Sequence, residues 1–255
     1  MRAIDFHMHP VFMGDGCNRA AVHRLATRSR ALGIERMVAL GDVLVHGRTP
    51  NARQLAAIND QTAQIVRWRP DFFIGFCYLN PTLGARAVER EVERCVGGLG
   101  FRGLKLEIAN NARDACMQPV MRAAEHWNVP VLQHSWSQTN IRQRRFHSDP
   151  ADTALLARRF PRVQVVMAHL SGCGFRGVLE AKGVPNLSLD TSGGLPEADL
   201  VEYAVDHLGA AHVVYGSDLP IRETSTTLGR IVGSQITAAE KRLILYGNAQ
   251  RLLKL

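Results

Sequence analysis

The sequence predicts an α/β fold in which one domain forms a closed (β/α)8 barrel, the TIM-barrel architecture. Short apolar runs alternate with longer helix-like stretches along the whole 255-residue chain. Such alternation is typical of right-handed β-α-β units and a parallel sheet. Eight units in about 250 residues match a closed barrel better than an open sheet. No Gly/Ser-rich or Pro-rich linker interrupts the pattern, so we expect residues 1–255 to form a single domain.

Each expected strand is a short run rich in aliphatic and β-branched residues, and each expected helix spaces its apolar residues at helical intervals. The expected strands, in chain order, are residues 3–9, 36–40, 72–78, 103–107, 130–134, 163–169, 187–190 and 213–217. The expected helices are residues 19–32, 51–68, 85–95, 118–127, 151–160, 177–181, 197–208 and 238–246.

The composition excludes several classes of protein. Hydrophobic residues make up 46% of the chain and charged residues 21%, which is globular and excludes disordered, collagen-like and coiled-coil chains. The net charge of +8 permits an acidic partner but does not require one. Because no long Lys/Arg block occurs, solvated helix faces explain this charge better than a nucleic-acid surface.

The cysteines and the first residues indicate a cytoplasmic protein. The five cysteines form no C-x-x-C pair, which argues against a disulfide framework and against a zinc ribbon. Residues 1–10 do not resemble a signal peptide, and no apolar run approaches the length of a membrane span. We therefore expect a reducing compartment and no membrane partner.

Ionisable residues gather where the expected strands end. They are His7, His9, His134, His169 and Asp218. A barrel forms its active site at the carboxyl ends of its strands, so donors from four separate strands meet at one rim. Imidazole and carboxylate are the usual ligands of divalent metals. The sequence therefore predicts a metal site.

Alternation along the first strand places Asp5, His7 and His9 on one face. We expect this face to point into the barrel mouth, with Asp5 orienting a histidine. The apolar residues of the opposite face should pack against the helices, and these are Ile4, Phe6 and Met8.

Seven motifs spread over nearly the whole chain resemble the metal-dependent amidohydrolase superfamily, in particular its amidohydrolase 2 branch of barrel hydrolases and non-oxidative decarboxylases. They are IDFHMHP, GFRGLKLE, VPVLQH, FPRVQVVMAHLSG, VPNLSLDTSG, VVYGSDLP and ILYGNAQRLLKL. The resemblance implies that His7, His9, His134 and Asp218 bind a divalent ion, usually Zn²⁺, with Mn²⁺ or Fe²⁺ as alternatives. It also implies that His169 lies beside the ion and contacts the substrate or orients a ligand.

Two of these residues have expected catalytic roles. A bound metal lowers the pKa of its water from about 15.7 toward 7. Asp218 can take a proton from that water and deliver it to the leaving group, and His169 can stabilise an oxyanion or hold a substrate carboxylate. The alternative for His169 is a core histidine that hydrogen-bonds a backbone carbonyl.

Lys105 shares the inner face of its strand with Glu107, and the simplest interpretation is an ion pair at the barrel mouth. The alternatives are that Lys105 binds a substrate carboxylate or, if carbamylated, bridges a second metal as in binuclear relatives. Many family members have His where Glu107 stands, so substrate specificity does not transfer from the family directly.

A long segment, residues 135–149, follows the fifth strand and suggests a lid over the site. It carries Trp136, Arg142, Arg144, Arg145 and His147. Arginines beside a metal suit a carboxylate or phosphate substrate, and a solvated loop is the alternative.

Two further residues lie close to expected site residues. Arg222, four residues after Asp218, is a candidate substrate contact with the same alternative of a solvated side chain. Cys173 lies close to His169, and we interpret it as a packing residue.

The expected function is a hydrolase that uses metal-activated water on a small ester, lactone or amide that carries a carboxylate. The alternative within the fold is a metal-dependent non-oxidative decarboxylase of a small unsaturated or aromatic acid. A nucleic-acid enzyme and a catalytically inactive barrel scaffold are the rivals from other classes. The expected partner is a small molecule, and a homo-oligomer is possible.

Overall fold

The computed structural model describes residues 2–10, 17–137, 142, 144–194 and 197–255. The strands found there are β1 (Ala3–Met8), β2 (Ile34–Ala39), β3 (Phe73–Gly75), β4 (Cys77–Leu79), β5 (Leu104–Leu106), β6 (Val131–Gln133), β7 (Val165–Met167), β8 (Leu187–Asp190) and β9 (Val213–Val214). The α-helices are α1 (Arg19–Ala31), α2 (Ala52–Trp68), α3 (Ala85–Val92), α4 (Met117–Trp127), α5 (Pro150–Arg159), α6 (Leu170–Ala181), α7 (Leu200–Leu208), α8 (Thr224–Gly233), α9 (Ala238–Arg242) and α10 (Asn248–Leu253).

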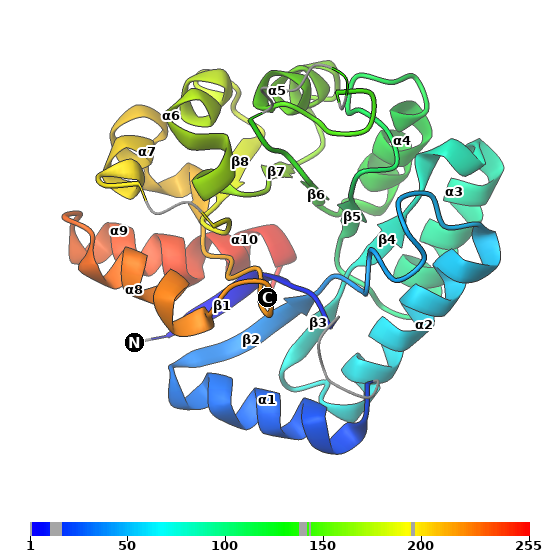
Figure 1. Cartoon of the computed structure of the whole chain (residues 1–255), viewed down its shortest axis with the longest axis horizontal. Coiled ribbons are helices and arrows are strands. Elements are labelled where there is room, and N and C mark those ends of the chain that lie inside the picture. The colour runs from blue at the N-terminus through cyan, green and yellow to red at the C-terminus, as the bar shows by residue number, and fades with distance from the viewer. Residues whose placement is uncertain (1, 11–16, 138–141, 143, 195–196) are drawn as a thin grey trace.

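The strands form a closed parallel barrel surrounded by helices, as Figure 1 shows. Strand pairing runs β1-β2-β3 and β4-β5-β6-β7-β8-β9, all parallel. β3 and β4 are two halves of one expected strand, separated only by Phe76, whose N–H donates to the Ala39 carbonyl at 3.0 Å. The last strand meets the first where the Phe6 N–H donates to the Tyr215 carbonyl at 2.9 Å. The predicted (β/α)8 barrel is confirmed.

Several helices begin where the sequence supplies a cap. The Asn51 side chain accepts from the Gln54 N–H and the Gln54 side chain accepts from the Asn51 N–H, which closes a capping box at the start of α2. Thr237 and Glu240 make the same box at α9. The helices α8 and α10 were not expected from the sequence, and α6 begins seven residues before the helix predicted at 177–181.

The apolar core has two layers, one inside the barrel and one between the barrel and the surrounding helices. The inner layer joins strand residues to α10, which contributes Ala249, Leu252 and Leu253. The outer layer joins the other faces of the strands to the surrounding helices. Among the described residues no helix has both the length and the apolar character needed to cross a bilayer.

The expected orientation of β1 is wrong for two apolar residues. Ile4 and Phe6 belong to the inner layer, while Met8 belongs to the outer one. The register of β1 against β2 shifts between Asp5 and Met8. This irregularity changes the side to which successive side chains point, which is why Phe6 and Met8 lie in different layers although they are two residues apart.

Close packing inside the barrel depends on a glycine. Phe6 and Phe76 meet edge to face with ring centroids 5.4 Å apart. A Cβ built at Gly103 would overlap the Phe76 ring, so only glycine fits beside this pair.

Gly103→Ala should therefore lower the free energy of unfolding by about 1–3 kcal/mol, the usual cost of overpacking a core. Gly98→Ala is the matched control, because a Cβ at Gly98 meets nothing within 4 Å. The measurement is urea denaturation of both variants, and an equal effect of the two substitutions would contradict the packing argument.

Candidate active site

Polar residues from four strands meet at the carboxyl end of the barrel. His7 and His9 come from the end of β1, His169 follows β7, Asp190 ends β8 and Asp218 follows β9. All five are buried. The structure thus brings together four of the predicted site residues and adds Asp190.

The hydrogen bonds of His7 and His9 fix which ring nitrogen carries the proton. His9 Nδ1 lies 3.1 Å from the Gly41 carbonyl oxygen, which can only accept, so Nδ1 is the donor. His7 Nδ1 lies 2.7 Å from Asp190 Oδ2 and donates to that carboxylate. In each neutral ring the Nε2 atom is therefore the one with the lone pair. These two Nε2 atoms face each other at 3.1 Å.

Both rings are neutral near pH 7. Burial lowers the pKa of His9 to about 4 and holds the pKa of His7 well below its usual range. The positive charge of Lys105 acts in the same direction on both. Two neutral imidazoles whose lone pairs point at one another repel, and a cation between them turns this repulsion into coordination.

Asp218 completes this group of donors. Its Oδ1 lies 3.5 Å from His7 Nε2 and 3.8 Å from His9 Nε2. That oxygen is buried, and no described residue donates a hydrogen bond to it. Nitrogen, nitrogen and oxygen within 4.8 Å of one another are suitable ligands for a divalent metal. The group His7, His9 and Asp218 can therefore hold such an ion.

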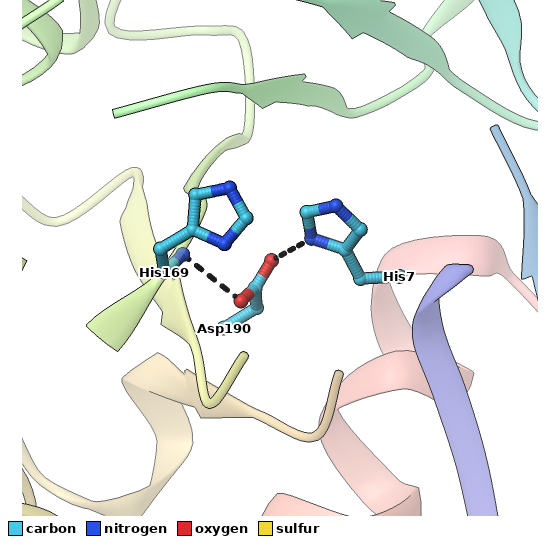
Figure 2. Close-up of side chains that lie close together, drawn as sticks. All are labelled: His7, His169 and Asp190. Atoms are coloured by element: carbon cyan, nitrogen blue, oxygen red, sulfur yellow. Dashed lines mark hydrogen bonds and ion pairs between the residues drawn. The ribbon is translucent and has the colours of Figure 1, made fainter. Parts of the chain in front are cut away.

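Asp190 fixes several parts of the site by accepting hydrogen bonds from them. Its Oδ2 accepts from His7 Nδ1, and its Oδ1 accepts from the His169 N–H at 3.1 Å and from the Ser192 N–H at 2.9 Å. Figure 2 shows the carboxylate between the two histidines. One side chain thus fixes a ring on β1 and the backbone after β7. Sequence reasoning missed this role, although the inward position of Asp190 at a strand end was a usable signal.

Asp5 does not orient a histidine ring, contrary to expectation. Its carboxylate accepts from the His7 N–H at 3.1 Å and from Ser217, through the N–H at 2.9 Å and the hydroxyl at 2.5 Å. Burial raises the pKa of Asp5 to about 7, and these hydrogen bonds oppose the rise. Asp5 therefore joins β1 to the segment that carries Asp218.

His134 lies on the same rim and contacts Glu107 and His169. Its Nδ1 is 2.9 Å from Glu107 Oε1 and 3.2 Å from His169 Nε2. A carboxylate on Nδ1 leaves Nε2 free, the arrangement that Asp190 gives His7. Among the described residues, two groups of three have ligand atoms within 4.8 Å of one another, and neither includes His134. They are His7, His9 and Asp218, and His7, His169 and Asp190. The part of His134 in holding the ion stays a prediction.

Lys105 and Glu107 form the ion pair that the sequence suggested. Lys105 is fully buried and its Nζ lies 3.0 Å from Glu107 Oε2. Burial acts to raise the pKa of Glu107, but the charges of His134 and Lys105 outweigh it and hold that pKa well below its usual range. The cation of Lys105 thus keeps Glu107 ionised beside His134.

His169 and Asp218 are held in strained backbone conformations. His169 has φ 70° and Asp218 has φ 61°, the left-handed region that few residues other than glycine adopt. His169 Nδ1 lies 2.9 Å from Ser192 Oγ and 4.0 Å from Asp218 Oδ2. Burial raises the pKa of Asp218 to about 7, and the charge of Lys105 opposes this rise.

An aromatic side chain, Trp136, packs beside His169. The Trp136 ring lies edge to face with the His169 ring, with centroids 5.6 Å apart. A Cβ at Gly172 would overlap the indole, so glycine makes room for it. Cys173 is buried, and burial raises its thiol pKa well above the usual value, which agrees with a packing role.

The segment expected to form a lid is described only in part, because residues 138–141 and 143 lie outside the described range. Arg144 forms an ion pair with Asp152 at 3.0 Å, so its charge is already compensated. Arg145 lies 5.4 Å from the centre of the Phe146 ring, and the His147 ring lies 6.4 Å from that of His134. Whether the segment closes over a substrate stays a prediction.

Asp190→Asn should weaken metal binding about 10- to 100-fold, because the amide cannot hold the His7 ring as the carboxylate does. Equilibrium dialysis against Mn²⁺ or Zn²⁺ with elemental analysis measures this. Asp206→Asn is the control, since Asp206 is exposed on α7. Unchanged affinity in Asp190→Asn would mean that the carboxylate does not orient the ligand.

Comparison with known proteins agrees with the barrel. Similar solved structures include 2,6-dihydroxybenzoate decarboxylase from Rhizobium, with 19% identity, a TM-score of 0.76 and coverage of 100% of this chain and 99% of that one. Another is 5-carboxyvanillate decarboxylase from Sphingomonas paucimobilis, with 17% identity, a TM-score of 0.75 and coverage of 100% and 99%. A third is dihydroxybenzoic acid decarboxylase from Polaromonas sp. JS666 with bound manganese, with 19% identity, a TM-score of 0.75 and coverage of 100% and 97%.

These identities are low, so the three structures establish the fold alone. The family is established separately by a sequence model. The model of the amidohydrolase family matches residues 4–255, nearly the whole chain. The resemblance seen in the strand-end motifs is thereby confirmed, and the chain belongs to the amidohydrolase family.

Proposed function

We propose that this protein is a metal-dependent non-oxidative decarboxylase of a small unsaturated or aromatic carboxylic acid. The observation that carries the proposal is that His7 and His9 direct the lone pairs of their Nε2 atoms toward each other. Asp218 Oδ1, which accepts no hydrogen bond from a described residue, lies beside them, and His169 lies next to Asp218. The sequence alone favoured hydrolysis. The similar solved decarboxylases favour the alternative instead.

His7, His9 and Asp218 would hold the divalent ion, with His134 as a fourth ligand. When bound, the ion supplies a Lewis acid that fixes and polarises substrate oxygens. Manganese has support from the structure that contains it, and zinc remains the alternative. Asp190 and the Gly41 carbonyl keep the His7 and His9 rings in the tautomer that such an ion requires.

The reaction needs a proton delivered to carbon. The bond between the ring or alkene carbon and the carboxyl carbon breaks, its electron pair stays on the former, and carbon dioxide leaves. A proton then takes the vacated position. Asp218 and His169 lie 4.0 Å apart and are the groups that can supply it, and solvent then restores the proton.

The surroundings of His169 suit a flat unsaturated substrate. Trp136 offers an aromatic edge beside His169, against which an unsaturated ring can pack.

Lys105 acts through Glu107 and His134 in this proposal, because its ammonium is fully buried against the Glu107 carboxylate. That ion pair also favours the unmodified amine over a carbamylated bridge between two metals.

The test is to incubate Mn²⁺- or Zn²⁺-loaded enzyme with panels of hydroxybenzoic acids, unsaturated acids and lactones. The proposal predicts carbon dioxide release from an acid, with one deuterium at the vacated carbon when the reaction runs in D₂O. Lactone opening without carbon dioxide release would contradict it and restore the hydrolase.

His169→Asn should lower kcat about 100- to 10,000-fold, the usual contribution of general acid-base catalysis, while the bound metal content stays unchanged. His126→Asn is the control, since His126 is exposed on α4. Steady-state kinetics and elemental analysis of the same samples measure both quantities. Equal loss of metal and activity would assign His169 to metal binding instead of proton transfer.

A further inference from the structure

Arg230 of α8 reaches toward the rim of the barrel, and the hydrogen-bond partners of its side chain among the described residues are neutral groups. Its Nη1 donates to Ser171 Oγ at 2.7 Å and to the Gly193 carbonyl at 3.3 Å. The side chain is half-buried, yet the ion pairs found among the described residues do not include it. A guanidinium has five N–H donors in a planar fork, so two contacts to neutral oxygens leave its charge uncompensated.

Arg222 supplies a second guanidinium beside Gly194, the residue that follows Gly193. A Cβ built at Gly194 would overlap Nη2, Cζ and Nε of Arg222, so the guanidinium lies directly against this glycine. Among the described residues, its side chain donates one hydrogen bond, from Nη1 to the Ile221 carbonyl at 3.3 Å, and no carboxylate there forms an ion pair with it.

The two arginines are close enough to repel each other. Burial lowers the pKa of Arg230, and the charge of Arg222 lowers it further. Two neighbouring like charges, of which Arg230 is half-buried and Arg222 exposed, cost free energy unless an anion joins them.

The position of the pair ties it to the proposed site. Ser171 follows His169 by two residues, and its N–H donates to the Ser192 carbonyl at 3.0 Å. Ser192 in turn contacts His169 through its hydroxyl. The Arg222 N–H donates to the Asp218 carbonyl at 3.1 Å, and the charge of Arg222 lowers the pKa of Asp218. The pair therefore borders the two groups assigned to proton transfer.

We propose that Arg222 and Arg230 together bind a second carboxylate of the substrate, away from the carboxylate that is lost, so that the preferred substrate is a dicarboxylic acid. The choice of a carboxylate rests on the proposed function. A planar carboxylate offers two oxygens to the guanidinium N–H groups and compensates the charge of both arginines. Gly194 allows this because any side chain there would displace Arg222.

The test compares isophthalate, a benzene ring with two carboxylates, with benzoate, which has one. Isothermal titration calorimetry on metal-loaded protein measures both Kd values without needing turnover. We expect isophthalate to bind about 10-fold tighter or more, in the range for charge-assisted hydrogen bonds. Arg230→Gln and Arg222→Gln should each remove most of this preference and leave the Kd of benzoate unchanged.

Two further variants separate charge from structure. Gly194→Ala keeps both charges but moves the Arg222 guanidinium, and it should reduce the preference for isophthalate. Arg86→Gln removes an exposed charge on α3 and should leave the preference unchanged. Thermal unfolding and metal content of every variant confirm that the protein stays folded and loaded.

The outcomes distinguish this inference from the proposed function. Equal affinity for the two ligands in the unaltered protein, or a preference that survives in both arginine variants, would overturn the inference. A fall in benzoate affinity equal to that of isophthalate would also overturn it, because the effect would then be structural. If the preference depends on the arginines but no acid releases carbon dioxide, the proposed function fails and the second-carboxylate site stands.

Discussion

The site depends on one constraint, the direction in which two histidine rings are held. Asp190 and the Gly41 carbonyl each accept the Nδ1 proton of a ring, so His7 and His9 present their Nε2 lone pairs to each other. Burial lowers the pKa of both rings and removes the option of relieving the contact by protonation near pH 7. The protein therefore holds two strong donors in a geometry that becomes favourable only when a cation lies between them.

The barrel holds these two histidine rings in a fixed position. β1 is buried along its whole length, and Asp5 joins it to Ser217 at the point where the barrel closes. Asp190 at the end of β8 extends the same fixed frame to His169. Strained φ values at His169 and Asp218 show that the surrounding hydrogen bonds determine the backbone there. A site built on strand ends and closed by buried carboxylates can keep its ligands in place before any substrate arrives.

The sequence was sufficient to predict the barrel and to predict that most of the candidate site residues meet at one rim, because both follow from local patterns. Strand ends in a barrel share one rim, so His7, His9, His169 and Asp218 had to meet if the strands were correctly placed. The orientation of Ile4 and Phe6 could not be predicted, because it depends on a register shift against β2 that leaves no mark in the alternation.

Other features are tertiary and were missed for that reason. Asp190 acts on residues from two other strands, and no spacing in the chain reveals those contacts. Arg230 lies on α8, whose Thr- and Gly-rich sequence has weak helix propensity and was not expected to be helical. Its proximity to Ser171 and Gly193 arises only when α8 packs beside the first turn of α6 and the loop after β8.

The account is tested most directly by diffraction from crystals soaked in Mn²⁺, with data collected at the manganese absorption edge. It predicts one anomalous peak between the rings, at about 2.0–2.3 Å from His7 Nε2, His9 Nε2 and a carboxylate oxygen of Asp218. A fully soaked crystal in which the two Nε2 atoms still face each other with no peak between them would contradict it.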